Sequence, residues 1–259
     1  MNNPSSRASW TASVYDRIGL NYSQVRRPDP RFEAAIWNAL GSAKSVLNVG
    51  AGCGSYEPAD REVTAVEPSP VMIAQRPESA APAIQGAAEA LPLRDKSVDA
   101  TMCVFTMQHW DNVQQGLDEV LRVTCDRVVI LTVDPDVMAR MWLCNEYLPE
   151  IGEHDRHTFP SMEYLEARLP HLHIGTVPVP ADCTDGFCIA FWNRPEAILD
   201  PRVRQASSIW HLLPAVVVEE ALARLHRDLE SGDWDRRFGQ LRRQAALDVG
   251  LRLAVSELT

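Results

Sequence analysis

Three glycines and one acidic residue in the first third of the chain have the types and spacing needed to hold a ligand rich in hydroxyl groups. The glycines Gly50, Gly52 and Gly54 follow the apolar run of residues 45–49, which is typical of a buried parallel strand. Because glycine has no Cβ, such a turn can approach a ligand closely. We expect a helix after the turn to direct its N-terminal N–H groups at the ligand.

Glu67 ends a second predicted strand, 17 residues beyond Gly50. This is close to the spacing of about 20 residues found when two βα units share one nucleotide crevice. A carboxylate there can accept hydrogen bonds from both hydroxyls of a ribose. The glycine spacing is G-x-G-x-G, whereas dinucleotide folds use G-x-G-x-x-G and would need a glycine at Ser55. The pattern therefore favours a nucleoside ligand other than a dinucleotide.

Further motifs follow in order, namely Gly86-Ala-Ala-Glu-Ala-Leu-Pro92, Asp95-Lys-Ser-Val-Asp99 and the apolar run 100–105. Together with the glycine turn and Glu67, they make residues 15–133 resemble the small class I S-adenosylmethionine (SAM) methyltransferases related to the ubiquinone and trans-aconitate enzymes. The resemblance implies a SAM cofactor and methyl transfer. It leaves the acceptor compound, and whether carbon, nitrogen, oxygen or sulfur is methylated, undetermined.

The resemblance also assigns roles to residues. The glycine turn would cradle the methionine part of SAM, Glu67 would bind the ribose, Met72 would pack on the adenine, and Ala88 and Glu89 would hold the adenine edge. The full set of cofactor residues expected on this basis is Tyr22, Arg26, Asn48, Gly50, Ala51, Gly52, Gly54, Glu67, Pro68, Met72, Ala88, Glu89, Thr106 and His109.

Tyr22, Arg26 and Asn48 are expected at the methionine end of the cofactor. Tyr22 and Arg26 match the family's Y-x-x-x-R-x-P lid, which would place the arginine over the methionine carboxylate. Asn48 stands where the family usually has Asp or Glu. An asparagine can bond a backbone amide or a water near the methionine end, but it brings no charge to hold the cofactor's ammonium group.

The chain offers few candidates for acid–base chemistry. SAM carries an activated methyl group, so the protein must mainly position a nucleophile and exclude water. A hydroxyl acceptor would also need a base, and His109, after the fourth predicted strand, is the candidate. For an alkene carbon, Tyr15 could take the final proton. Aromatic side chains at Trp142, Phe187 and Trp192 are expected to line an apolar substrate pocket.

Composition limits the class of protein. The chain has 259 residues, 46% of them hydrophobic, and a net charge of −10 with only two lysines. The negative charge disfavours a nucleic-acid partner. We expect a cytoplasmic monomer or homodimer with a small-molecule substrate, because neither a signal peptide nor an apolar stretch of about 20 residues is present. Six scattered cysteines predict reduced thiols rather than a metal site, and His154 and His157 are expected in a loop before Pro160.

Alternating strand and helix patterns predict an α/β fold with a Rossmann-like, seven-stranded, mostly parallel sheet and helices on both faces. Strands are predicted at 45–49, 63–66, 83–85, 100–105, 127–133, 174–179 and near 251–257, and helices at 12–25, 70–76, 137–148, 161–168, 201–213 and 214–231. We expect a single domain over residues 1–259, with a lid and first helices in 1–40, a SAM-binding core in 45–133 and a C-terminal helical insertion in 187–246.

Several alternatives remain open at this stage. Residues 187–192 could form the seventh strand, followed by a helical tail. The protein could bind SAM without turnover, as a regulator or partner subunit, an idea that Asn48 motivates. It could also be a nucleotide oxidoreductase, although the glycine spacing argues against this, or an arsenite methyltransferase, for which the cysteine spacing gives no support.

Overall fold

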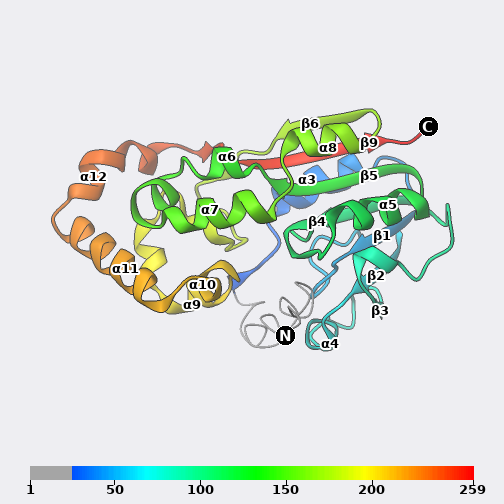
Figure 1. Cartoon of the computed structure of the whole chain (residues 1–259), viewed down its shortest axis with the longest axis horizontal. Helices are drawn as coiled ribbons and strands as arrows, with labels where there is room; N and C mark the ends of the chain where they lie inside the picture. Colours follow the sequence, from blue (N-terminus) through cyan, green and yellow to red (C-terminus); the bar gives the residue numbers. More distant parts are fainter. Residues whose placement is uncertain (1–24) are drawn as a thin grey trace, which may run out of the picture.

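The computed structural model describes residues 25–259, and its centre is a seven-stranded sheet (Figure 1). The strands lie in the order β3-β2-β1-β4-β5-β9-β6. Strands β1 to β5 are parallel, and β9 runs antiparallel between β5 and β6. Their bounds are β1 (Ser45–Val49), β2 (Glu62–Glu67), β3 (Ala83–Gln85), β4 (Val98–Val104), β5 (Thr124–Val133), β6 (Leu172–Thr176) and β9 (Leu251–Glu257). The predicted fold class is confirmed, while the helix predicted at 12–25, with Tyr15 and Tyr22, falls almost wholly outside the described residues.

Helices cover both faces of the sheet because successive strand side chains point in opposite directions. On one face, Ile36 of α3 (Pro30–Ala39) shares a core cluster with Val46 of β1. On the other face, Leu117 of α5 (Val113–Val123) and Leu165 of α8 (Met162–Arg168) share a second cluster with Leu47. The strand order reverses between β1 and β4, which is where open α/β sheets bind their ligands.

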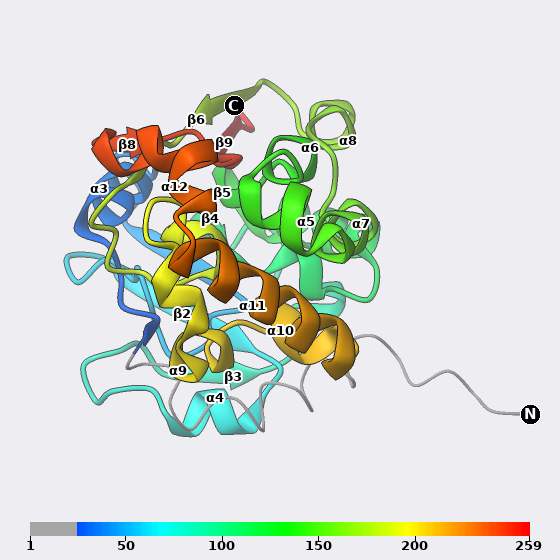
Figure 2. The same cartoon turned by 90° about the vertical axis from the view of Figure 1, so that its left-hand side faces the viewer.

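A mostly helical insertion joins β6 to β9 and extends from one end of the sheet (Figures 1 and 2). Residues 188–191 form the 3-10 helix η5, so the alternative that placed a strand at 187–192 is wrong. The remaining elements are β7 (Val179–Pro180), η6 (Pro195–Leu199), α9 (Pro201–Gln205), α10 (Ile209–Leu212), α11 (Ala215–Glu230), α12 (Asp233–Phe238), η7 (Gly239–Arg243) and β8 (Ala246–Leu247).

Trp142, in the segment that follows β5, packs against this insertion. Its ring meets that of Trp234 of α12 edge-on, with 5.4 Å between ring centroids. Its Nε1 donates to the carbonyl oxygen of Trp192 at 2.7 Å. Burying aromatic side chains of this size dominates core energetics. The segment itself consists of α6 (Pro135–Met138), the π-helix η4 (Leu143–Tyr147) and α7 (Pro149–Thr158).

The structure corrects the predicted helix after the glycine turn. Residues 50–61 form turns and extended chain, followed by β2, and contain no helix. Tyr56 has φ +67°, a left-handed conformation that a right-handed helix does not accommodate. Between β2 and β3 the only α-helix is the five-residue α4 (Pro70–Ala74). The glycine turn therefore presents individual backbone groups at the strand end rather than a helix terminus.

Other boundaries also differ from those predicted. The helix predicted at 137–148 is interrupted and ends in a π-helical turn, in which Leu148 N donates to Leu143 O. The helix predicted at 201–213 divides into α9 and α10, and the strand predicted at 174–179 ends at Thr176. His154 and His157 lie on α7 rather than in a loop.

Candidate functional site

The glycine turn packs directly against the neighbouring strand ends. Gly50 N and Ala51 N both donate to Val66 O of β2, at 2.9 and 3.1 Å. Gly50 has φ +67°, and a Cβ there would lie 1.8 Å from Thr106 Oγ1. Gly52 has φ +50° and more open surroundings. Position 50 therefore requires glycine for steric reasons as well as for its backbone conformation.

Glu67 lies at the end of β2 and is buried, with 6% of its surface exposed. Its two carboxylate oxygens accept from Gly52 N at 2.8 Å and from Ser69 N at 2.9 Å. Burial raises the pKa of this carboxyl, and the two backbone donors partly oppose the increase. Each oxygen can accept a further bond, so the ribose role remains chemically suitable.

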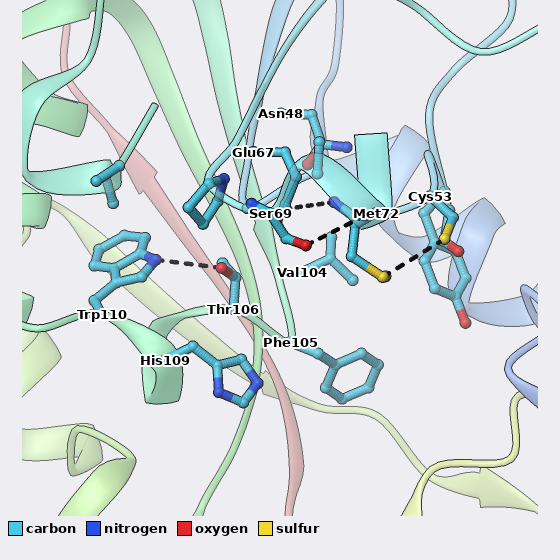
Figure 3. A pocket seen from close by; sticks show the side chains of 18 of the residues that line it. Asn48, Cys53, Glu67, Ser69, Met72, Val104, Phe105, Thr106, His109 and Trp110 are labelled. Atoms are coloured by element: carbon cyan, nitrogen blue, oxygen red, sulfur yellow. Dashed lines mark hydrogen bonds between the residues drawn. The ribbon is translucent and has the colours of Figure 1, made fainter. Parts of the chain in front are cut away.

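A first cavity opens beside these groups and contains about 1010 Å³, solvent at its mouth included. Figure 3 shows Glu67, Ser69 and Met72 on one side of this pocket, with Phe105, His109 and Trp110 facing it from the segment after β4. Its lining includes most of the predicted cofactor residues: Arg26, Asn48, Gly50, Ala51, Gly52, Glu67, Pro68, Met72, Ala88, Glu89, Thr106 and His109. Gly54 is not part of it.

Sequence reasoning missed several residues that line this cavity, among them Cys53, Tyr56 and Asp185. Phe105 is another, and its φ of +51° is uncommon for a non-glycine residue. Phe105 and Tyr56 thus both occupy sparsely populated backbone conformations at the cavity wall, as residues at functional sites often do. The position of Phe105 directly after β4 is a signal that could have identified it.

Asn48 is buried and donates through Nδ2 to Glu57 Oε1 at 3.0 Å, instead of bonding a backbone amide. The Glu57 carboxylate is also held by Arg76, whose Nη2 lies 2.7 and 2.8 Å from its two oxygens. Glu57 does not line the cavity. It therefore does not supply there the negative charge that Asn48 lacks.

The segment after β4 fixes one wall of the site. Trp110 Nε1 donates to Thr106 Oγ1 at 3.2 Å. The amide nitrogen of Gln108 donates to Phe105 O at 2.8 Å and lies 3.1 Å from His109 Nε2. Because the bond to Phe105 orients the amide, its nitrogen also donates to His109, which makes Nε2 of that ring an acceptor.

A second cavity of about 930 Å³ adjoins the first, and the two share Arg26, Phe105 and His109. The apolar part of its lining comprises Val133, Met138, Phe159, Phe187, Ile189, Ile209 and Leu212. Gln108, His154, Asp155 and Ser207 supply polar groups. Of these polar groups, Gln108 Oε1 and Ser207 Oγ are buried without a hydrogen-bond partner among the described residues.

Of the three predicted substrate residues, only Phe187 lines this cavity. Trp142 and Trp192 are buried in the core, where Nε1 of Trp142 donates to the carbonyl oxygen of Trp192, and neither lines the first or the second cavity. Their size and burial explain the discrepancy, because large aromatic side chains serve cores as well as pockets. Within residues 25–259 there is no cluster of three or more metal-ligating side chains, and no helix long and apolar enough to cross a bilayer.

Comparisons with known proteins agree with this geometry. Residues 47–131 match the family model of a methyltransferase domain. An uncharacterized methyltransferase of Mycobacterium tuberculosis is 37% identical over 105 residues, which cover 38% of this chain and only 42% of that protein. The crystal structure of a candidate methyltransferase from an antibiotic biosynthesis pathway of Anabaena variabilis is 32% identical. The match covers 91% of this chain and 100% of that one, with a TM-score of 0.83.

A third similarity concerns the fold alone. The plantazolicin methyltransferase, solved with S-adenosylhomocysteine (SAH), is 14% identical, with a TM-score of 0.55 over 97% of this chain and 94% of that one. Taken together, the sheet order, the glycine turn and the full-length similarity to the Anabaena protein show that the chain belongs to the class I SAM-dependent methyltransferases. The predicted family, enzyme class and SAM cofactor are therefore confirmed.

The first cavity fits this cofactor. At Gly52 the turn leaves open the space that a Cβ would fill, and the buried Glu67 carboxylate offers acceptors to a ribose. The cofactor, when bound, supplies a methyl group activated by attachment to a sulfonium sulfur. Nearly all of the polar and apolar groups assigned to it by family resemblance are brought together around one cavity.

Proposed function

We propose that this protein transfers the methyl group of SAM to a small, largely apolar acceptor that lies in the second cavity. The observation that carries the proposal is the shared boundary of the two cavities at Arg26, Phe105 and His109. A methyl donor in the first cavity and an acceptor in the second would meet there, as in-line transfer requires an approach of about 3–3.5 Å.

The lining of the second cavity supports the class of acceptor. Apolar side chains predominate, and the unpartnered Gln108 Oε1 is suited to accept a hydrogen bond from the ligand. Arg26 is the only Lys or Arg residue in the described lining, and it is paired with Asp185. These groups favour a neutral molecule with at least one hydrogen-bond donor. The similarity to a candidate antibiotic-pathway enzyme supports an acceptor from specialised metabolism.

The described residues would act mainly by binding, orienting and excluding water. Phe105 and Phe187 lie with 5.2 Å between ring centroids at the boundary, where they would screen the reacting atoms from solvent. No proton transfer is needed for an amine acceptor that arrives unprotonated. A hydroxyl acceptor would need a base, and both His109 and His154 line the second cavity.

The test uses the purified full-length protein, SAM and cell extract, with intact-mass detection of products heavier by one methylene. We expect Ile209→Trp, which adds bulk inside the second cavity, to abolish product formation while the Kd for SAH changes by less than about twofold. Val216→Trp on the exposed surface of α11 is the matched control and should change neither. Equal turnover by the Ile209→Trp variant would refute the proposed acceptor cavity.

The alternative is a SAM-binding protein without turnover. It predicts tight SAH binding with no methylated product from any extract. Tight NAD binding without SAH binding would instead contradict the cofactor assignment itself.

A further inference from the structure

Asp185, the acidic member of a buried ion pair that lines the first cavity, has no role in the site described so far. Asp185, with 2% of its surface exposed, lines the cavity together with Arg26 and Tyr56. Arg26 Nε donates to Asp185 Oδ1 at 2.5 Å, and Tyr56 OH donates to Oδ2 at 2.8 Å. A carboxylate desolvated to this degree is costly unless it is paired.

Three distant segments of the chain hold this pair in place. An isolated β-bridge joins Arg26 to Asp185, and Gly186 N donates to Val25 O at 3.0 Å. A Cβ at Gly186 would lie 2.4 Å from Val25 Cγ1, so glycine is needed for this close approach. Tyr56 reaches the pair from the glycine-turn segment. The carboxylate is thus positioned by the fold, not by a local turn.

The cofactor's amino-acid end is a zwitterion, and it needs partners of both signs. Glu67, Glu89 and Asp185 are the acidic residues in the described lining of the first cavity. Glu67 is placed at the ribose, and Glu89 accepts from Asn112 N on the adenine side. Asn48 is neutral, and its partner Glu57 faces away from the cavity. Asp185 is the acid that remains for the ammonium group.

We propose that Asp185 binds the α-ammonium group of the cofactor while Arg26 binds its carboxylate. In the absence of ligand the two side chains neutralise each other. When the cofactor binds, Asp185 exchanges Arg26 for the ligand's ammonium group, and Arg26 exchanges Asp185 for the ligand's carboxylate. Neither side chain is left unpaired. This inference rests on the proposed placement of the cofactor in the first cavity and goes beyond it by assigning the residue that replaces the missing charge at Asn48.

The experiment compares three ligands by calorimetry on the full chain. SAH has both charged groups, its deaminated analogue keeps only the carboxylate, and 5′-methylthioadenosine has neither. We expect Asp185→Asn to weaken SAH binding by about 10- to 100-fold. The Kd for methylthioadenosine should stay within about twofold. The deaminated analogue should bind the variant equally or more tightly, because Asp185 no longer competes for Arg26.

Asp182→Asn is the matched control. Asp182 lies three residues earlier in the same segment, its side chain is 82% exposed, and it pairs with Arg31. It does not line the cavity, so its removal should leave all three affinities unchanged. Thermal melting of both variants reports their folding.

Three outcomes would overturn the inference. Equal losses for all three ligands would make Asp185 a structural residue. Equal losses for SAH and the deaminated analogue, with methylthioadenosine unaffected, would mean that Asp185 only orients Arg26. If the variant does not fold, the wild-type protein is tested directly, and binding SAH less than about tenfold more tightly than the deaminated analogue would be the third such outcome. Failure of methylthioadenosine to bind at all would instead contradict the placement of the adenosine end.

Discussion

Glu67 combines burial with an acceptor role, and this combination makes its removal informative. We expect Glu67→Ala to weaken SAH binding by about 1.5–3 kcal/mol, the range for losing hydrogen bonds to a charged group. The fold should survive, since the carboxylate holds only two backbone donors. Calorimetry with SAH and a thermal melt measure the two effects. Unchanged affinity would show that the carboxylate does not contact the ribose.

The pH dependence of cofactor affinity follows from the same residue. Burial raises the pKa of Glu67 above its usual value of 4.5. The ionised form accepts from the ribose hydroxyls, so affinity should be full above the raised pKa and should fall as the pH decreases through it. Glu67→Gln should remove this limb from a plot of SAH affinity against pH. A profile shared by wild type and variant would assign the limb to another group, such as the ligand's adenine.

The histidines differ in their surroundings. Nε2 of His109 accepts from the Gln108 amide, which occupies the lone pair a base would use. His154 Nδ1 lies 2.9 Å from Asp155 Oδ1, a geometry that orients an imidazole. With a hydroxyl acceptor we therefore expect His154→Ala to lower kcat by about 10²-fold and His109→Ala by tenfold or less. With an amine or alkene acceptor, the rate depends mainly on how the reactants are positioned. The loss of kcat should then stay below about 10²-fold in both variants.

Steady-state kinetics across pH test this assignment. The acidic limb of the kcat profile should vanish in His154→Ala if this residue is the base. If His109→Ala instead shows a large loss of kcat and of the acidic limb, with normal SAH affinity, His109 is the base.

At the level of elements, helix α5 packs behind Trp110, which lines the first cavity. A Cβ at Gly116 of α5 would lie 2.4 Å from Trp110 Cε3. Trp110 in turn lines the first cavity and bonds Thr106. Glycine-to-alanine changes inside helices usually stabilise by about 0.5–1 kcal/mol. For Gly116→Ala we expect the opposite, because the added Cβ would overpack against Trp110. The free energy of unfolding should fall by about 1–3 kcal/mol, and SAH binding should weaken.

Urea denaturation of Gly116→Ala measures that change. Gly239→Ala is the control, because its Cβ would meet only Asp235, at 3.4 Å or more. A stabilised Gly116→Ala variant with normal SAH affinity would show that Trp110 shifts without consequence for the cavity.

At the scale of the molecule, the helical insertion contacts the N-terminal segment next to the cofactor cavity. Arg26 and Asp185 are separated by 159 positions along the chain, yet they pair there. The insertion is anchored elsewhere by Trp142 and Trp234. Ligand binding at this junction should therefore order segments from both ends of the chain.

Hydrogen exchange with and without SAH tests this expectation. Amides in residues 25–30 and 187–213 should gain protection along with the glycine turn. Helix α12, which is remote from both cavities, should show no change. Protection confined to the glycine turn would mean that the insertion does not respond to the cofactor.

The sequence alone determined the parts of the protein that depend on local spacing. The bounds of β1, β3 and β9 agree with those predicted, and Gly50, Gly52, Glu67, Met72 and Ala88, which the motifs predict as cofactor residues, line the first cavity. The strand bounds are predictable because apolar runs and strand alternation act over a few residues. The helix expected after Gly54 failed because the left-handed Tyr56 serves a distant partner, Asp185.

Only the tertiary structure decided which remote residues share the site. Nothing in the local sequence around Asp185, His154 or Ile209 distinguishes a ligand-facing residue from an ordinary one. Asp185 and Ile209 reach the cavities because the insertion returns to the sheet, where it packs against Trp142, and His154 reaches the second cavity from α7. The same packing made Trp142 and Trp192 core residues. The sequence thus determined the cofactor and the class of chemistry, while the fold decided which residues surround the first and the second cavity.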